Sequence, residues 1–269
     1  MALTEKEILR YKHPMGVPGM GIDMQEGLKA ARILVVGAGG LGSPILQYLS
    51  ASGVGVLGIA DFGVVMEEDL HRMPLYQMQD IRKHKAKMAA SRLWGLNPFT
   101  KHYPFLLQVH PGNVGDLIEN FDLVLDCSQD AATHLVINDA CIIKDKPFII
   151  AEVHNWMSWF GGFNLPLKDN ERTASYRCNQ ELIDEYRNFD AGALGTTHGA
   201  TAILLANEIL KWIAGVSTFA GKLFTYDFLH NTQQIIELSP DMARLEAVRV
   251  VGILTAEAYG MELVPEIDD

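Results

Sequence analysis

Residues 32–61 read RILVVGAGGLGSPILQYLSASGVGVLGIAD, and the fold follows from this stretch. Its first part, Arg32 to Val36, is a short apolar run rich in β-branched residues, which predicts a buried strand. The glycines at positions 37, 39 and 42 come next and match the pattern G-x-G-x-x-G, ahead of a helical run that ends at Ser52. A second apolar run, from Val54 to Ile59, leads to Asp61. The stretch therefore predicts a strand, a glycine turn, a helix, and a second strand that ends at an acid.

The glycines of this turn have distinct mechanical tasks. One permits a tight turn, one lets the backbone approach a phosphate, and one allows the helix to pack closely on the strand. The start of the helix offers free N–H groups and the positive end of a dipole to an anion. Asp61 stands at the spacing expected of a carboxylate that binds a ribose. A glycine turn alone could be purely structural, but its combination with both strands, the helix and Asp61 favours nucleotide binding.

Composition excludes several classes of function. The chain has 269 residues and a formal net charge of −11, which makes it a poor candidate for binding nucleic acid or an anionic membrane. No apolar run reaches membrane-spanning length, and the first residues lack the features of a signal peptide. We therefore expect a cytoplasmic protein.

The cysteines are few and scattered. There are three, Cys127, Cys141 and Cys178, which is too few for a disulfide framework. No C-x-x-C pair is present, and one thiolate cannot build a structural zinc site. We therefore expect no zinc.

The order of the predicted elements indicates the fold class. Strands alternate with helices from residue 31 to 155, which predicts a Rossmann-like, mostly parallel α/β sheet with helices on both faces. We expect residues 1–30 to form a helical arm and residues 156–269 to continue the same domain with an antiparallel part, including a crossover loop at 167–195. Within that loop we expect residues 167–190 to act as a mobile loop or lid. Further expected elements are a helix at 81–96, strands at 103–109, 121–127 and 147–153, helices at 114–120, 131–144 and 196–214, a strand at 156–165, a hairpin at 221–227 and 233–238, and a helix at 241–259.

Several short motifs in register resemble one known family. They are Leu9-Arg10-Tyr11, residues 35–43 (VVGAGGLGS), Ala60-Asp61-Phe62, Asp69-Leu70-His71-Arg72, Lys85, Leu96-Asn97-Pro98, Leu125-Asp126-Cys127-Ser128, Asn138 and Tyr226-Asp227. The chain resembles the ThiF/MoeB/HesA family, the prokaryotic relatives of ubiquitin-activating enzymes. The matches extend from about residue 5 to residue 238 and keep the order of the family.

The resemblance implies ATP chemistry. Members of the family bind ATP at the glycine loop, with Mg²⁺, and let a carboxylate attack the α-phosphate, which yields an acyl adenylate and pyrophosphate. Here Asp61 would hold the ribose, and Arg72, Lys85 and Asp130 would be catalytic. Two fixed cations suit a reaction in which negative charge collects on phosphate oxygens. The resemblance assigns nucleotide binding to Arg10, Gly37, Gly39, Gly40, Leu41, Gly42, Asp61, Phe62, Asp69, Arg72, Lys85, Ser128 and Gln129.

The chain departs from the family at the expected metal site. The usual Asp-Cys-Thr-Asp-Asn is replaced by residues 126–130, DCSQD. Either Asp130 holds Mg²⁺ from a shifted loop, or metal handling is weakened.

Two further departures lie elsewhere in the nucleotide site of the family. Near the N-terminus, His13 replaces an arginine that reaches the partner's nucleotide in the family. Either His13 is a surface residue without a role, or Arg10 takes over that task. Gly63 replaces a second acid after Asp61.

The family's zinc cysteines and its crossover-loop cysteine are missing too, and Cys178 alone lies near that loop. A chain without the acceptor cysteine is expected to stop at the adenylate of a small-molecule carboxylate. An example is the pyridinol of the iron-guanylylpyridinol (FeGP) cofactor, which a family member adenylates.

Three alternatives stay open. The first is activation of the C-terminus of a ubiquitin-like sulfur carrier, the second an inactive nucleotide-binding homologue, and the third an NAD dehydrogenase. A downstream acyl-accepting protein is a possible partner. We expect a homodimer, with helix 196–214 near its interface.

Overall fold

Strand β1 (Arg32–Val36) lies inside an eight-stranded sheet, between β2 (Val56–Ala60) and β4 (Leu123–Asp126). The computed structural model describes residues 2–187, 192–216 and 219–264. The strand order is β3-β2-β1-β4-β5-β6-β7-β8. The first five strands in this order are parallel and the last three are antiparallel. The remaining strands are β3 (Lys101–Phe105), β5 (Phe148–His154), β6 (Met157–Phe163), β7 (Lys222–Asp227) and β8 (Thr232–Glu237).

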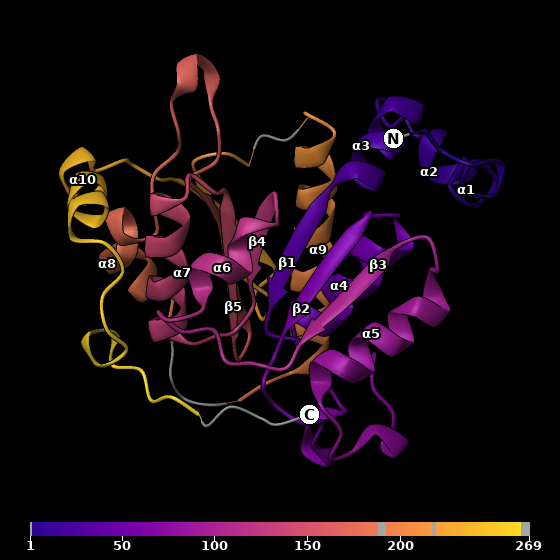
Figure 1. Ribbon diagram of the computed structural model, residues 1–269, viewed down its shortest axis with the longest axis horizontal. Coiled ribbons are helices and arrows are strands. Elements are labelled where there is room, and N and C mark those ends of the chain that lie inside the picture. The colour runs from indigo at the N-terminus through magenta and orange to yellow at the C-terminus, as the bar shows by residue number, and fades with distance from the viewer. Residues whose placement is uncertain (1, 188–191, 217–218, 265–269) are drawn as a thin grey trace.

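Helices cover both faces of the sheet (Figure 1). On β1, Ile33 and Val35 belong to one apolar core and Leu34 and Val36 to the other, because successive side chains of a strand point to opposite faces. A parallel strand that is buried on both sides is apolar throughout, as this one is, and the predicted fold class is confirmed. The first core lies under α3 (Ile22–Ala30), α4 (Gly42–Ala51), α5 (Lys85–Leu96) and α9 (Gly195–Ile213), and the second under α6 (Val114–Glu119), α7 (Ala131–Ile143) and α10 (Met242–Val251).

The N-terminal helices are fastened to this sheet. Helix α1 (Glu5–Arg10) begins with a capping box, in which the Glu7 N–H donates to Thr4 Oγ1 and the Thr4 N–H donates to a Glu7 carboxylate oxygen. After it, Tyr11 is 2% exposed and its hydroxyl accepts a hydrogen bond from Asn97 Nδ2 at 2.8 Å. Helix α2 (Lys12–Met15) then leads to α3.

Three predicted boundaries are wrong. Helix α5 begins at Lys85 rather than at residue 81, because Arg82 has a positive φ of 68° and donates its N–H to the Val65 carbonyl. Strand β3 ends at Phe105, where its pairing with Ala60 at the end of β2 stops. The expected C-terminal helix breaks at Gly252, whose φ is 79°, and only a short 3₁₀ turn, Glu257–Tyr259, follows.

The segment expected to act as a lid is partly integral to the core. Residues 173–176 are buried, and Thr173 exchanges hydrogen bonds with Leu165 through its N–H and its hydroxyl. A short helix, α8 (Gln180–Asp184), follows. Residues 188–190 of the expected lid lie outside the described residues. In the described part of the chain, no helix has the length and apolar character needed to cross a membrane.

Candidate nucleotide site

The glycine turn lies at the carboxyl end of β1, where the strand order reverses between β2 and β4. Ligands of open α/β sheets bind at such a switch point. Gly37 has a φ of 88°, and a Cβ there would lie 2.7 Å from the Cys127 carbonyl oxygen. A Cβ on Gly42 would lie 1.8 Å from the Gly37 oxygen, so the first turn of α4 requires glycine. Leu41 is fully buried, which leaves only its backbone to a ligand.

Asp61 braces this turn. One carboxylate oxygen accepts the Ala38 N–H at 2.7 Å, and the other accepts the Gly63 N–H at 2.7 Å. Burial raises the pKa of Asp61 above its ordinary value, and the two N–H groups partly offset the rise. The carboxylate therefore fixes the backbone on which a nucleotide would lie. Gly63, which replaces an acid of the family, is one of its two donors.

A cavity of ≈ 100 Å³ opens beside Asp61. Four residues that the sequence assigns to nucleotide binding, Gly37, Asp61, Phe62 and Ser128, contribute to its wall. The other lining residues are Val36, Ala60, Leu107, Gln108, Val109 and Thr133.

Arg72 and Lys85 meet on one carboxylate. Asp69 accepts from Arg72 Nη2 at 2.8 Å and pairs with Lys85 Nζ at 3.0 Å. Burial opposes the charge of Asp69, but Lys85 and Arg72 outweigh it and hold its pKa below the ordinary value. Tyr76 donates its hydroxyl to the Ala38 carbonyl at 2.8 Å, and the same hydroxyl lies 3.3 Å from the Lys85 carbonyl oxygen, so Tyr76 connects the backbone of Lys85 to the glycine turn. The structure thus brings the two predicted catalytic cations together on one carboxylate.

The turn between β4 and α7 carries the altered metal motif. Ser128 donates its N–H and its hydroxyl to Asp126 Oδ1, at 3.0 and 2.7 Å. Gln129 has a positive φ of 59°. Asp130 caps α7, and its Oδ2 accepts from the Thr133 N–H at 2.8 Å and from the Thr133 hydroxyl at 2.6 Å. Its Oδ1 bonds to no group among the described residues. One carboxylate oxygen is therefore available, and Mg²⁺ takes oxygen ligands, often a single carboxylate beside phosphates and waters.

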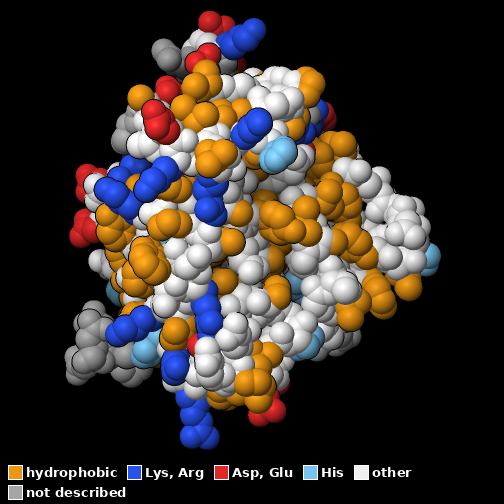
Figure 2. Space-filling model, turned by 90° about the vertical axis from the view of Figure 1, so that its right-hand side faces the viewer, with side chains coloured by type: hydrophobic (Ala, Val, Ile, Leu, Met, Phe, Trp, Pro, Cys, Tyr) orange, Lys and Arg blue, Asp and Glu red, His pale blue; other side chains and the backbone are white. Residues whose placement is uncertain are grey.

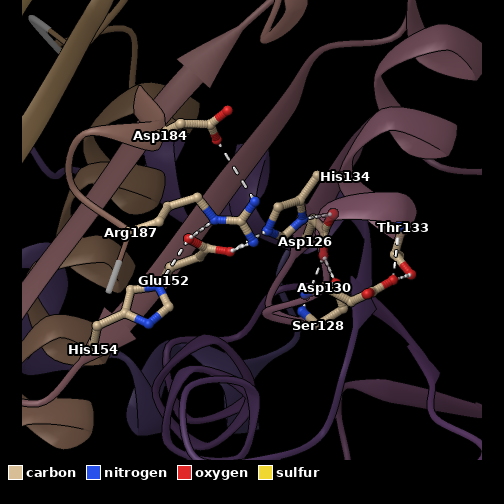
Figure 3. A network of polar contacts seen from close by, with 9 residues as sticks. All are labelled: Asp126, Ser128, Asp130, Thr133, His134, Glu152, His154, Asp184 and Arg187. Carbon is tan, nitrogen blue, oxygen red and sulfur yellow. Dashed lines mark hydrogen bonds and ion pairs between the residues drawn. The ribbon is translucent and has the colours of Figure 1, made fainter. Parts of the chain in front are cut away.

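A buried chain of charged groups extends from this turn toward the crossover region (Figure 3). His134 Nδ1 lies 2.7 Å from Asp126 Oδ2, and His134 Nε2 lies 2.7 Å from Glu152 Oε1. Glu152 also accepts from Arg187, at 2.7 and 2.9 Å, and pairs with His154 at 3.0 Å. Burial alone would lower the pKa of His134, but Asp126 and Glu152 raise it to about 9. Burial opposes the charge of Glu152, but His134, His154 and Arg187 outweigh it and lower its pKa.

Sequence reasoning missed this network. The available signal was the presence of acids within apolar strands, at Asp126 in LVLD and Glu152 in FIIAEVH. Strands β4 and β5 are parallel neighbours, so acids near their carboxyl ends lie close together.

Within one chain, Arg10 lies apart from the other residues that the sequence assigns to nucleotide binding. It is on α1 and donates to the Leu96 carbonyl at the end of α5. His13, which stands where the family has an arginine, is in the neighbouring helix α2.

All three cysteines are free thiols, and none of them is fully exposed. Cys127 and Cys141 are buried, and burial raises the pKa of both thiols. Cys178 Sγ lies 3.2 Å from Ser175 Oγ and accepts the Asp241 N–H at 3.3 Å. Across residues 2–187, 192–216 and 219–264, no group of three or more His, Cys, Asp and Glu side chains is arranged to hold a metal ion.

Comparisons with a family model and with known proteins all indicate the same family. A model described as "ThiF family" matches residues 11–246. The sulfur carrier protein adenylyltransferase of Thermus thermophilus is 34% identical over 236 residues, which are 85% of this chain and 86% of that protein. The probable adenylyltransferase/sulfurtransferase MoeZ of Mycobacterium tuberculosis is 33% identical over 248 residues, 89% of this chain. The chain spans only 62% of the length of MoeZ.

Solved structures show the same architecture. Escherichia coli MccB, crystallised with MccA-N7isoASN, superposes with a TM-score of 0.75 over 87% of this chain and 72% of its own. The sequence identity is 19%, so this likeness concerns the fold alone. With a family model that covers most of the chain and relatives at 33–34% identity, the chain belongs to the ThiF family.

Proposed function

We propose that the protein uses ATP to adenylate a carboxylate. The observation that supports this most is the position of the Arg72–Asp69–Lys85 cluster, because Tyr76 connects the backbone of Lys85 to the glycine turn. A dehydrogenase would use the turn and Asp61 but would have no task for two cations at the phosphates. An inactive homologue would not need them held in place by a buried carboxylate.

The chemistry then requires no proton transfer in its first step. An ionised carboxylate oxygen attacks the α-phosphorus, the bond between the α-phosphorus and the bridging oxygen breaks, and pyrophosphate leaves. Arg72 and Lys85 stabilise the charge that builds on the phosphate oxygens. Asp130 Oδ1 would hold Mg²⁺, which neutralises part of the phosphate charge when bound. Asp61 would orient the ribose.

The substrate we propose is a small-molecule carboxylate, of which the pyridinol of the FeGP cofactor is one example. A covalent relay needs an accessible thiol, whereas Cys127 and Cys141 are buried and the Sγ of the half-buried Cys178 is hydrogen-bonded to Ser175 and Asp241. A second candidate is the C-terminus of a sulfur carrier protein. The Thermus thermophilus relative favours it, because that protein aligns over 86% of its own length.

A pyrophosphate-exchange screen tests the function. Labelled pyrophosphate should enter ATP only in the presence of a suitable carboxylate. The screen would include aromatic and heteroaromatic carboxylic acids, and a sulfur carrier protein that ends in Gly-Gly. Exchange with a small acid supports the first candidate, exchange with the carrier protein alone supports the second, and no exchange with any of them contradicts the proposal.

Asp61→Ala is expected to weaken ATP binding by about 1–3 kcal/mol, because it removes a charge-assisted hydrogen bond to the ribose and the brace of the turn. Calorimetry with ATP measures the change. Asp116→Ala, in the first turn of α6, is the control and should bind ATP as the unmodified protein does. Equal ATP affinity of Asp61→Ala and the unmodified protein would contradict the role of Asp61.

Cys178→Ala is expected to retain pyrophosphate exchange within about twofold, because the thiol takes no part in forming an anhydride and its hydrogen bonds are weak. Exchange measured at saturating ATP checks this. A loss of exchange without a loss of thermal stability would assign the thiol a role that this mechanism lacks.

We also propose a homodimer. On α9, Ile203 is 45% and Leu204 37% exposed, and on α1, Leu9 is 76% exposed. The face that carries α5 and the N-terminal helices shows hydrophobic patches among Lys and Arg side chains (Figure 2). A symmetric dimer would cover such patches and bring Arg10 toward the partner's nucleotide. Light scattering at micromolar concentration should give twice the chain mass of 29.8 kDa, and a mass of one chain would contradict the dimer.

A further inference from the structure

The first turn of α9 lies between the two elements that would hold phosphates. A Cβ on Gly195 would lie 2.2 Å from the His71 carbonyl oxygen and 3.2 Å from Arg72 Cα. One turn later, a Cβ on Gly40 would lie 2.6 Å from His198 Cδ2 and 3.1 Å from His198 Nε2. The imidazole of His198 therefore packs directly against the glycine turn, beside the loop that carries Arg72.

His198 uses only one of its ring nitrogens. The residue is 1% exposed, and Nδ1 lies 2.9 Å from the Leu194 carbonyl oxygen, to which it must donate. Nε2 is then the acceptor of a neutral ring, and it has no hydrogen-bond partner among the described residues. Nε2 is not among the polar atoms that the protein encloses completely, so it is the part of this nearly buried ring that a ligand beside Gly40 can reach.

The surroundings of His198 favour an anion. Burial lowers the pKa of His198, the bond to Leu194 opposes this, and the nearby Arg72, His71 and His154 lower it further. Arg72 and His71 come from the loop after β2, and His154 comes from the end of β5. These neighbours disfavour a proton on His198. An anion in their midst would reverse the balance, because an opposite charge within a few ångströms favours the protonated ring.

We propose that His198 is a further ligand of ATP, which takes up a proton when the nucleotide binds and donates Nε2–H to a phosphate oxygen over Gly40. The lone pair of the neutral ring would repel that oxygen, whereas the protonated ring attracts it. The proton comes from solvent and returns to solvent when the nucleotide leaves. This inference rests on the proposed binding of ATP, and it adds a linkage between nucleotide affinity and pH.

Calorimetry with ATP tests the linkage. Titrations at one pH in two buffers with different ionisation enthalpies give the number of protons taken up. The unmodified protein should take up close to one proton more than His198→Gln. Above neutral pH its ATP affinity should fall by up to about tenfold per pH unit, a dependence that His198→Gln should lack. At neutral pH the variant should bind ATP about ten- to a hundredfold more weakly.

His230→Gln is the matched control, because His230 lies in the turn between β7 and β8 and is 69% exposed. It should retain the proton uptake of the unmodified protein. Equal uptake and equal pH dependence in His198→Gln would overturn the inference and leave ATP binding intact. A protein that binds no ATP at all would overturn the proposed function as well.

A second measurement needs no variant. In the protein labelled with ¹⁵N at histidine, ATP should shift one ring Nε2 resonance from the unprotonated to the protonated range at neutral pH. If no histidine nitrogen gains a proton upon addition of ATP, the inference is wrong.

Discussion

Alanine at Arg72 or at Lys85 should lower the rate of pyrophosphate exchange by roughly 10²–10³-fold, the range for one preorganised donor, and change ATP affinity far less. Asp69 holds both cations in place, so little reorganisation is needed when charge builds at the α-phosphate. Contacts that strengthen only in the transition state act on rate rather than on binding. Exchange at saturating ATP and calorimetry, measured on the same variants, separate the two effects.

Lys87→Ala is the matched control for Lys85→Ala, because Lys87 is on the same helix and is exposed. It should exchange pyrophosphate at the rate of the unmodified protein. If the Arg72 and Lys85 variants lost affinity and rate in equal proportion, the two cations would be ground-state ligands only. If they lost neither, the proposed site would be wrong.

His134→Ala should lower the free energy of unfolding by about 3–5 kcal/mol, the usual cost of removing one partner from a buried ion pair. His134 is fully buried between Asp126 and Glu152, and its loss leaves two buried carboxylates without their shared donor. Urea unfolding measures the change. Asp184→Ala is the control, since its carboxylate is 45% exposed and lies 3.7 Å from Arg187. Because this carboxylate is exposed and stands far from the guanidinium, its removal should cost less than about 1 kcal/mol.

The network also predicts how stability depends on pH. The pKa of His134 is raised from an ordinary value of 6.5 to about 9 in the folded protein. A raised pKa means that the folded state binds the proton more tightly, so this stabilisation is complete below about pH 6.5 and is lost as pH rises through about 9. The free energy of unfolding should therefore fall between these values in the unmodified protein. The fall should be absent in His134→Ala, and an equal fall in both proteins would contradict the assignment.

The sheet could be predicted because its signals are local. The run from Arg32 to Val36 is apolar on both sides, the glycines mark the turn, and the alternation with helical stretches excludes most other folds. The ends of elements were harder to predict. Helix α5 starts late because Arg82 takes a left-handed conformation that bonds to Val65, a contact across the loop that helical periodicity cannot report.

The candidate site likewise contains residues that local motifs predict and residues whose contacts only the tertiary structure reveals. Gly37, Asp61, Arg72 and Lys85 follow from motifs and come together in the structure. The role of Asp130 as the cap of α7, and the meeting of His134 with Glu152, depend on which buried polar groups face each other after folding. Periodicity reports that a position is buried, but the partner of a buried charge is a property of the tertiary structure.

Isotope transfer tests the central claim most directly. A carboxylate that supports exchange would be labelled with ¹⁸O in both oxygens and incubated with ATP and the protein, and the AMP would be analysed by mass spectrometry. Attack of the carboxylate on the α-phosphorus, followed by attack of water or another acceptor on the acyl carbon, places one ¹⁸O atom in AMP. The account predicts that AMP carries one ¹⁸O and that the protein carries no acyl adduct. AMP without ¹⁸O, or ¹⁸O in pyrophosphate or phosphate instead, would contradict it.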